Sequence, residues 1–243
     1  MYTLTQDIQI EGIGMHSGEP VTMVVGPSRV EGIHIDYVGV SIPVDITSVG
    51  DEHLRSTTLE RDGVQVRTPE HFLAACFGLQ LTQINIKLSA AEFPILDGSA
   101  QGFVDALMEY RKVIDCEQNV LKIDTVDRFD VGDSMYIAMP YDGFNVTCFI
   151  DYPDRWVGSM VFNYQHSEQN YLNGLASART YGFMDEVESL RERGLAKGGS
   201  LDNALVVTED GYLNEPRFSD EMVRHKVLDF MGDMAIGCDS IQW

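Results

Sequence analysis

Cationic side chains, cysteines and long apolar runs are all scarce in this 243-residue sequence. Its 17 Lys and Arg residues are outnumbered by 38 Asp and Glu residues, which gives a formal net charge of −21. Binding to nucleic acid requires a basic surface, so this composition argues against a nucleic-acid partner. It also means that any anionic ligand must be met by a local group of positive charges.

No stretch approaches the roughly 18 apolar residues that a membrane-spanning helix needs. Met1 is followed by the mixed stretch YTLTQDIQIEG, which does not look like an export signal. The four cysteines (Cys76, Cys116, Cys148 and Cys238) lie far apart, without a Cys-x-x-Cys pair. This spacing differs from the disulfide framework of small secreted domains. We therefore expect a cytoplasmic protein with reduced thiols and no stable membrane insertion.

The chain is long enough for one large domain or for two of about 120 residues. Its hydropathy pattern shows two rounds of strands followed by helices. The first round predicts strands at 3–10, 21–26, 32–38 and 83–89, and helices at 68–79 and 102–111. The second predicts strands at 121–129, 135–140, 144–151 and 203–208, and helices at 166–176, at 185–193 and after Ser219. This order favours two similar α+β domains, residues 1–118 and 119–243.

The stretch RTPEHFLAACFGL has the features of a helix start. Thr68 suits the N-cap, Pro69 suits the first helical position, and Gly78 is a suitable stop. Glu70 and His71 then occupy the first turn. There the helix dipole favours a carboxylate and a neutral imidazole, which is the form that ligates metals. Taken alone, the pattern also fits a capped helix with ordinary polar surface residues.

The final helix carries a column of polar residues, His225, Asp229 and Asp233, at intervals of four. At about 100° per residue, they fall on the side opposite an apolar stripe. The stripe consists of Val223, Val227, Phe230 and Met234. We therefore expect one face to pack and the other to present ligands. The simpler interpretation of the column is a solvated face with a His–Asp hydrogen bond.

Together the two segments predict a metal site formed by His71, His225 and Asp229. Three protein ligands with one open position are typical of catalytic zinc, although Fe²⁺ accepts the same nitrogen and oxygen ligands. The metal would lower the pKa of a bound water, and Glu70 would be the base that takes its proton. This is the chemistry of a hydrolase that acts on an amide or an ester. The spacing does not name the substrate.

Six segments, in order along the chain, resemble signature blocks of the UDP-3-O-acyl-N-acetylglucosamine deacetylase family. These are zinc enzymes that commit bacterial lipid A synthesis. The segments are EGIGMHSGEP (11–20), TPEHFLAA (68–75), EFPILDGSA (92–100), SARTYGF (177–183), KGGSLDNALVV (197–207) and RFSDEMVRHKVLDFMGD (217–233). The resemblance implies an α+β fold of two β-α-α-β layers that face each other with the active site between them.

The resemblance supports the metal ligands and base named above and implies further site residues. Thr180 would help the zinc to polarise the acetyl carbonyl and to stabilise the oxyanion. Lys226 would contact the nucleotide sugar, and Tyr181 and Phe183 would line its pocket. His16 is expected to face the same cleft. Without the resemblance, these residues would be interpreted as turn, surface and core residues.

The sequence departs from the family pattern at its end. Family members continue into a strand and a helix with a Gly-His motif. The histidine of that motif is the general acid and pairs with the carboxylate that corresponds to Asp233. The printed sequence reaches Trp243 without this motif, so we expect Asp233 to lack its partner and part of the second domain to be uncovered. Loss of an acid lowers a rate by about 10²–10⁴-fold. A partial chain and a natural variant that uses water or another group both remain open.

A second departure is Met139, at a position where many relatives carry a lysine that meets a substrate phosphate. Met139 has no positive charge with which to meet this phosphate.

We therefore expect a metal-dependent hydrolase that removes acetate from UDP-3-O-acyl-N-acetylglucosamine, a UDP-linked acylated amino sugar, and that acts as a monomer. The alternative is a noncatalytic homologue that binds metal and a nucleotide-sugar lipid or a partner protein without turnover. A third interpretation gives the polar column a structural role only. Glu70 favours an enzyme, because chemistry needs this residue and metal ligation does not.

Overall fold

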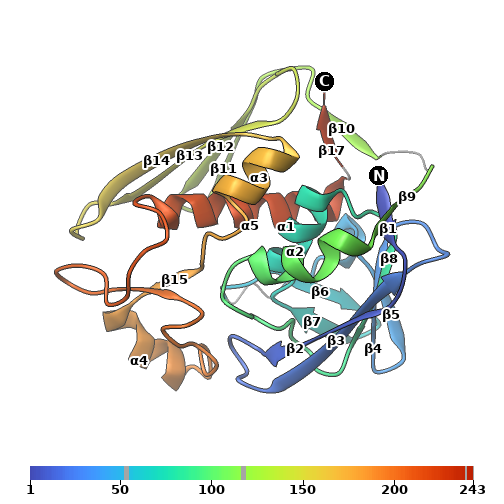
Figure 1. Cartoon of the computed structure of the whole chain (residues 1–243). Coiled ribbons are helices and arrows are strands. Elements are labelled where there is room, and N and C mark those ends of the chain that lie inside the picture. The colour runs from blue at the N-terminus through green and yellow to red at the C-terminus, as the bar shows by residue number, and fades with distance from the viewer. Residues whose placement is uncertain (52–54, 116–118, 239, 243) are drawn as a thin grey trace.

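The computed structural model describes residues 1–51, 55–115, 119–238 and 240–242, with only the backbone for the last range. The expected domain boundary at 118/119, the thiol of Cys116 and the terminal Trp243 lie wholly or partly outside these residues. The described residues form a mixed α/β fold with five α-helices and several small sheets. Figure 1 shows two central helices between the sheet of the first half and the strands of the second half.

A five-stranded sheet forms the base of the first half. Its strand order is β2 (Ile8–Ile13), β3 (Pro20–Pro27), β8 (Ile84–Leu88), β4 (Ile33–Tyr37) and β5 (Val40–Pro43). β4 and β8 are parallel, and the other neighbours are antiparallel. Along β3, the buried side chains of Val21, Met23 and Val25 alternate with more exposed ones. This face of the sheet therefore contributes to the main core.

The remaining strands form separate pairs. The antiparallel pairs are β1 (Tyr2–Leu4) with β9 (Arg111–Val113), β6 (Thr58–Arg61) with β7 (Val64–Arg67), β11 (Asp127–Val131) with β12 (Ser134–Ala138), and β13 (Asn145–Tyr152) with β14 (Gly158–Gln165). The parallel pairs are β10 (Val120–Lys122) with β17 (Ser240–Gln242), and β15 (Tyr181–Phe183) with β16 (Leu205–Val207). The mixed α/β class agrees with the sequence analysis, whereas two matching sandwich layers stay a prediction.

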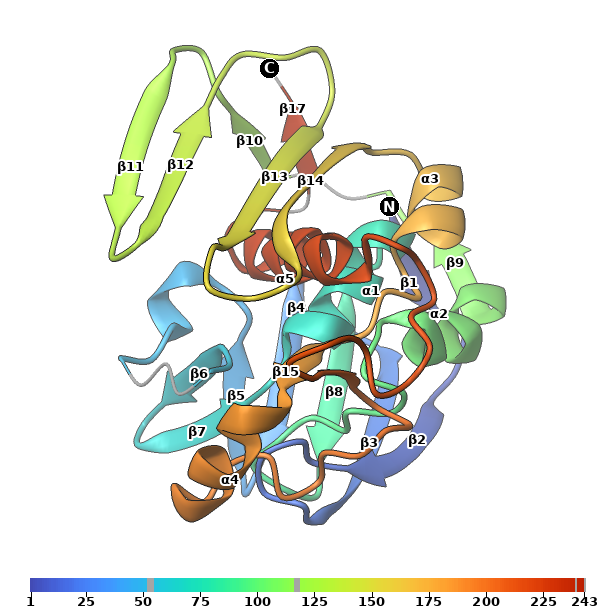
Figure 2. The ribbon, with the colours of Figure 1, turned by 90° about the vertical axis from the view of Figure 1, so that its left-hand side faces the viewer.

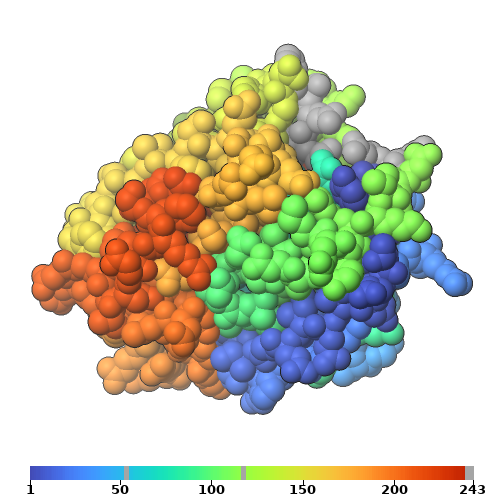
Figure 3. Space-filling view, in the orientation of Figure 1, coloured from blue at the N-terminus to red at the C-terminus, as the bar shows by residue number. Residues whose placement is uncertain are grey.

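Helices α1 (Glu70–Leu79) and α5 (Glu221–Gly237) pack against each other at the centre of the molecule. Figure 2 shows the β13–β14 pair above α5, and both strands contact this helix. Every residue of α1 is buried. The shorter elements are α2 (Gln101–Leu107), α3 (Glu168–Gly174), α4 (Met184–Glu192) and the 3₁₀ turns Ile46–Ser48 and Met108–Tyr110. Figure 3 shows the two halves in contact, with the first half in blue to green and the second in yellow to red.

The start of α1 corrects the predicted N-cap. The carbonyl of Pro69 accepts the hydrogen bond from Leu73 N at 2.8 Å, so Pro69 is the residue before the first helical residue. Thr68 has a left-handed backbone (φ 59°), and its hydroxyl donates to Glu92 Oε1 at 3.2 Å. Thr68 therefore joins α1 to a neighbouring loop and does not cap the helix.

The end of α1 lies one residue beyond the predicted stop at Gly78. Gln80, with a left-handed backbone (φ 55°), follows the last helical residue. Gly78 lies inside the helix, where a Cβ atom would come 2.2 Å from Cε1 of Tyr171 in α3. This glycine therefore allows a close approach between two helices and does not end one.

The described part of α5 begins at Glu221, within a residue of the predicted start. Val223 and Val227 of the apolar stripe are fully buried, as expected. On the opposite side His225 is only 1% exposed, because α1 packs there. The interpretation of the polar column as a solvated face is therefore wrong at His225.

Apolar side chains are exposed on two strand pairs of the second half. On the β11–β12 pair they are Phe129, Val131, Met135, Tyr136 and Ile137, and on the outer side of β13–β14 they are Phe149 and Val161. Figure 2 shows β11 and β12 standing away from the helices. Elsewhere the described cysteines Cys76 and Cys148 are not bridged. In the described residues, no helix has both the length and the apolar character to cross a bilayer.

Candidate metal centre

The contact between α1 and α5 brings together the three predicted metal ligands. Nε2 of His225 lies 3.2 Å from Oδ1 of Asp229, and Nε2 of His71 lies 3.5 Å from the same oxygen. The two imidazole rings meet edge to face, with centroids 4.8 Å apart. One ligand atom from each residue lies within 4.8 Å of the others. Side chains from opposite halves of the sequence therefore converge on one point.

The hydrogen bonds around this group leave lone pairs that face one another. Nδ1 of His225 lies 3.0 Å from the carbonyl oxygen of Ala178, which only accepts, so Nδ1 carries the hydrogen and Nε2 presents a lone pair. Oδ1 of Asp229 and Nδ1 of His71 are buried without a hydrogen-bond partner in the described residues. A bare nitrogen beside an unpaired carboxylate oxygen is unfavourable unless a cation joins them. The group therefore fits a divalent metal ion.

The neighbours of Asp229 keep it ionised. Burial acts to raise its pKa, but neighbouring positive charge, including that of Lys226, outweighs burial and holds the pKa well below its usual range. Nζ of Lys226 donates to Oδ2 of Asp229 at 3.0 Å. The second carboxylate oxygen is thus held by a lysine, while the first faces the two imidazoles.

Glu70 lies next to His71 and is also buried, and its Oε2 has no hydrogen-bond partner in the described residues. Burial, followed by the negative charge of Asp229, raises the pKa of Glu70 well above its usual range. The sequence analysis expected the helix dipole to favour the ionised form. The shift has the opposite sign because burial and a neighbouring carboxylate outweigh the dipole. Burial also lowers the pKa of His71, which favours the neutral imidazole as predicted.

Two of the predicted substrate-binding residues adjoin the ligand group. The ring of Tyr181 lies 6.4 Å from that of His225, and Nζ of Lys226 lies 5.4 Å from the Tyr181 centroid. The hydroxyl of Tyr181 shares a 2.8 Å hydrogen bond with that of Tyr152. Lys226 and Tyr181 therefore form a cationic and aromatic border beside the candidate metal ligands.

Phe183 is more buried than expected for a residue that lines a substrate pocket. It is 5% exposed and belongs to a second core cluster with Leu205. The guanidinium of Arg155 covers its ring at 3.8 Å from the centroid. The placement agrees with the alternative of a core aromatic, and its contact with substrate stays a prediction.

Thr180 stands just before β15 in a backbone segment that is fixed on both sides. Its N–H donates to the carbonyl of Gly98 at 2.7 Å, and its carbonyl accepts from Leu205 N at 2.8 Å. It follows Ala178 by two residues, and the carbonyl of Ala178 contacts His225. The segment that carries Thr180 therefore borders the ligand group.

Asp233 has a threonine as a hydrogen-bond partner in the described residues, and its expected lack of a histidine partner stays a prediction. Its Oδ1 accepts a hydrogen bond from the hydroxyl of Thr57 at 2.7 Å. His16 contacts the opposite half through Nδ1, which accepts from Ala196 N at 3.4 Å. His16 thus lies where the two halves meet but does not belong to the ligand group.

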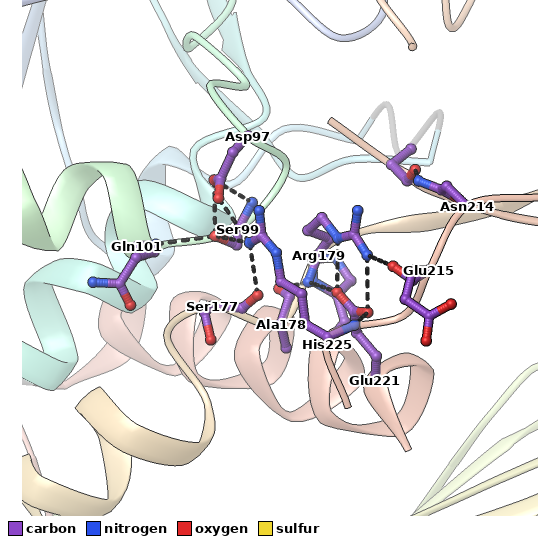
Figure 4. A network of polar contacts seen from close by, with 12 residues as sticks. Asp97, Ser99, Gln101, Ser177, Ala178, Arg179, Asn214, Glu215, Glu221 and His225 are labelled. Carbon is purple, nitrogen blue, oxygen red and sulfur yellow. Dashed lines mark hydrogen bonds and ion pairs between the residues drawn. The ribbon is translucent and has the colours of Figure 1, made fainter. Parts of the chain in front are cut away.

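Some groups that orient the candidate metal ligands could not be identified from the sequence pattern. The carbonyl of Ala178 orients His225, and the neighbouring Arg179 pairs with Glu221 in the first turn of α5. Figure 4 shows these groups in one network of polar contacts. Glu221 could have been noted as an acidic residue one turn before His225. The partner carbonyl could not, because every residue has one.

Comparisons with known proteins place the chain in a family. The profile described as "LpxC: UDP-3-O-acyl N-acetylglycosamine deacetylase" matches residues 1–242. A UDP-3-O-acyl-N-acetylglucosamine deacetylase of Haemophilus influenzae (strain PittEE) is 38% identical, with 96% of this chain aligned to 79% of that protein. Proteins of the same name from Histophilus somni (strain 129Pt) and Psychrobacter arcticus (strain DSM 17307 / VKM B-2377 / 273-4) are both 39% identical. The alignments cover 96% of this chain and 79% and 75% of those relatives. The chain therefore belongs to the UDP-3-O-acyl-N-acetylglucosamine deacetylase family.

Proposed function

We propose that this protein is a metal-dependent hydrolase that removes acetate from UDP-3-O-acyl-N-acetylglucosamine in lipid A synthesis. The observation that carries the proposal is the convergence of His71 with His225 and Asp229, beside a buried Glu70 of raised pKa. Membership of the deacetylase family supports the same reaction. A protein that only binds metal has no need of Glu70.

The two imidazoles and the carboxylate would hold the metal, and Zn²⁺ suits this donor set, with Fe²⁺ as the alternative. A divalent ion bound there would act as a Lewis acid toward the amide carbonyl and would lower the pKa of the attacking water. Asp229 would keep its second oxygen on Lys226, whose charge fixes the orientation of the carboxylate.

Glu70 would act as the general base. Its carboxylate would take one proton from water as the hydroxyl group adds to the acetyl carbon. The bond between that carbon and nitrogen then breaks, and the nitrogen takes up a proton to leave as the amine. One water is consumed in total: its hydroxyl leaves with acetate and its proton with the amine. Glu70, buried beside His71, would hold this proton between the two events.

The remaining predicted residues would bind and orient the substrate. The hydroxyl of Thr180 would donate to the oxyanion that develops on the carbonyl. Lys226 would offer positive charge to the nucleotide sugar, with Tyr181 beside it and Phe183 beneath Arg155. Asp233 would remain a supporting carboxylate, held by Thr57. Met139, which is exposed just after β12, offers no charge to a phosphate.

The wider organisation that we propose follows the sequence analysis. Residues 1–118 and 119–243 would form two domains of β-α-α-β plan with the site between them. The position of the ligand group between a helix of each half supports this division. We also propose a cytoplasmic monomer without a nucleic-acid partner, which the net charge of −21 supports.

The test measures metal content and acetate release from UDP-3-O-acyl-N-acetylglucosamine on the same Zn²⁺-loaded protein. Glu70→Gln is expected to keep the metal and to lower the rate by about 10²–10⁴-fold. His225→Ala is expected to lose the metal. Glu188→Gln, on the exposed side of α4, is the matched control and should change neither quantity.

Two results would contradict the proposal in different places. Full retention of metal by His225→Ala would contradict the ligand assignment. Metal-loaded protein that releases no acetate would favour the noncatalytic alternative.

A further inference from the structure

We propose that the buried Arg179–Glu221 ion pair is a positioning device for His225. In the described contacts, neither side chain reaches a candidate metal ligand, so the pair would act through the peptide group of residues 178–179, which lies between the pair and His225. The inference rests on the proposed metal site and deepens it, because it states what fixes the orientation of one ligand.

Glu221 is a carboxylate without any exposure to solvent. Its Oε1 accepts hydrogen bonds from N and Nε of Arg179, both at 2.9 Å. Its Oε2 accepts from Nη2 of Arg179 at 3.2 Å and from Arg217 N at 2.6 Å. Nη2 of Arg179 also donates to the carbonyl of Glu215 at 2.8 Å. A buried ion pair is stable only when further hydrogen bonds satisfy its remaining donors and acceptors, and these bonds fix the position of both side chains.

The link to the metal centre is one peptide group. Its N–H belongs to Arg179 and donates to Glu221, while its carbonyl belongs to Ala178 and lies 3.0 Å from Nδ1 of His225. Glu221 and His225 are one turn apart on α5, so both point from the same side of the helix. Figure 4 shows the two side chains holding the same segment. Two side chains of α5 therefore bind the N–H and the carbonyl of a single peptide group.

These two hydrogen bonds define which ring nitrogen of His225 is available to bind a metal ion. A carbonyl fixed at this place requires a hydrogen on Nδ1 and leaves the lone pair of Nε2 directed at Asp229. Donation of the N–H to a carboxylate polarises the peptide and strengthens its carbonyl as an acceptor. Partners of this kind beyond the ligands typically change metal affinity by about 10–100-fold.

The same helix provides a matched control. Asp220, the residue before Glu221, accepts from Nε of Arg224 at 2.6 Å, and Nη1 of Arg224 donates to the carbonyl of Gly174 at 2.6 Å. This pair also joins an arginine to a carboxylate and to a backbone carbonyl. It attaches α5 to the end of α3 and makes no contact with the 178–179 peptide among the described hydrogen bonds.

The experiment compares Glu221→Gln with Asp220→Asn in the full chain. Zn²⁺ affinity is measured by competition with a chelator. The tautomer of His225 is read from ¹⁵N NMR of labelled histidine in metal-free protein at mildly alkaline pH. Glu221→Gln should weaken Zn²⁺ binding by about 10–100-fold and mix the two tautomers. Asp220→Asn should change neither. Arg179→Lys keeps the charge and the backbone N–H donor but loses the two-point contact with Glu221, so it should weaken Zn²⁺ binding less than Glu221→Gln does.

A double variant keeps the test valid if Glu221→Gln does not fold. Arg179→Met/Glu221→Met removes both charges, and such replacements of buried pairs are often tolerated. It should show the same loss of affinity and of the single tautomer. Unchanged affinity, or weaker binding with the Nδ1–H tautomer intact, would overturn the inference. His225→Ala separates this from a failure of the site itself, since metal retained in that variant refutes the proposed ligands.

Discussion

Gly232 allows α5 to approach α1 at the candidate metal centre. A Cβ atom at this position would lie 2.1 Å from the carbonyl oxygen of Glu70, and a backbone atom cannot turn aside. Gly→Ala inside a helix normally stabilises by about 1 kcal/mol. Gly232→Ala is expected to lower the free energy of unfolding by about 1–3 kcal/mol, as overpacking does. It should also weaken Zn²⁺ binding, because His71 must move away from Asp229. Urea unfolding and chelator competition measure the two effects.

Gly237 in the same helix is the control for this prediction. Among the described residues, a Cβ atom there would meet only Cγ2 of Ile46, at 3.7 Å. Gly237→Ala should therefore leave stability unchanged or raise it, and leave the metal affinity as it is. If Gly232→Ala is as stable as Gly237→Ala, the close contact of α1 with α5 is refuted.

Residue types that carry their own chemistry were predictable from the sequence. His71, His225 and Asp229 stand out because few side chains bind metal and their spacing follows a helical turn. Thr57 was not predictable as the partner of Asp233, because the two residues lie far apart in the sequence and meet only in the folded chain. The sign of the Glu70 pKa shift also needed the structure, since it depends on burial and on a carboxylate from another helix.

At the scale of elements, the α1–α3 contact depends on Gly78. A Cβ atom on Gly78 would meet Cε1 and Cδ1 of Tyr171 at 2.2 and 2.3 Å. The Tyr171 ring is fully buried, so it cannot move aside without disturbing its neighbours. Gly78→Ala is therefore expected to destabilise the protein by about 1–3 kcal/mol, measured by urea unfolding.

Tyr171→Phe tests whether this effect comes from the ring or from its hydroxyl. The hydroxyl is buried without a hydrogen-bond partner in the described residues. Its removal should therefore be neutral or stabilising, and it should not rescue Gly78→Ala. Equal stability of Gly78→Ala and the wild type would contradict the close packing of these helices.

The elements whose apolar residues recur at one regular interval were predicted from the sequence. An element whose apolar residues follow one another without a regular interval was missed. The first-half strands that supply the core, and α1, α3, α4 and α5, lie near their predicted positions. β14 was missed because Met160 and Phe162 point inward while Val161 between them is exposed, so its apolar run shows no alternation. Helix α5 is buried on two sides, so a single stripe described only one of its contacts.

At the scale of the whole molecule, the net charge of −21 sets the response to salt. Like charges destabilise a compact chain, and added salt screens them over about 10 Å at 0.1 M. The midpoint of thermal unfolding should therefore rise between about 0.01 M and 0.3 M NaCl, since exposed ion pairs contribute little in comparison. A variant that neutralises exposed acids should show a smaller rise; suitable residues are Glu188, Glu209 and Asp210. A midpoint that falls with salt would show that ion pairs dominate.

The order of strands and helices predicted the mixed class, but not how the second half is built. The sequence contains no direct record of which strands pair, and β10 pairs with β17 from the far end of the chain. Such long-range pairings depend on the whole fold.

Translation gives the contact between α1 and α5 a further consequence. The first half of this chain leaves the ribosome well before α5, and α5 packs against one side of α1. During that interval the nascent chain exposes the side of α1 that carries Glu70 and His71, and only one of the three candidate ligands has been synthesised. The emergence of α5 therefore covers this side of α1 and assembles the metal centre in the same event.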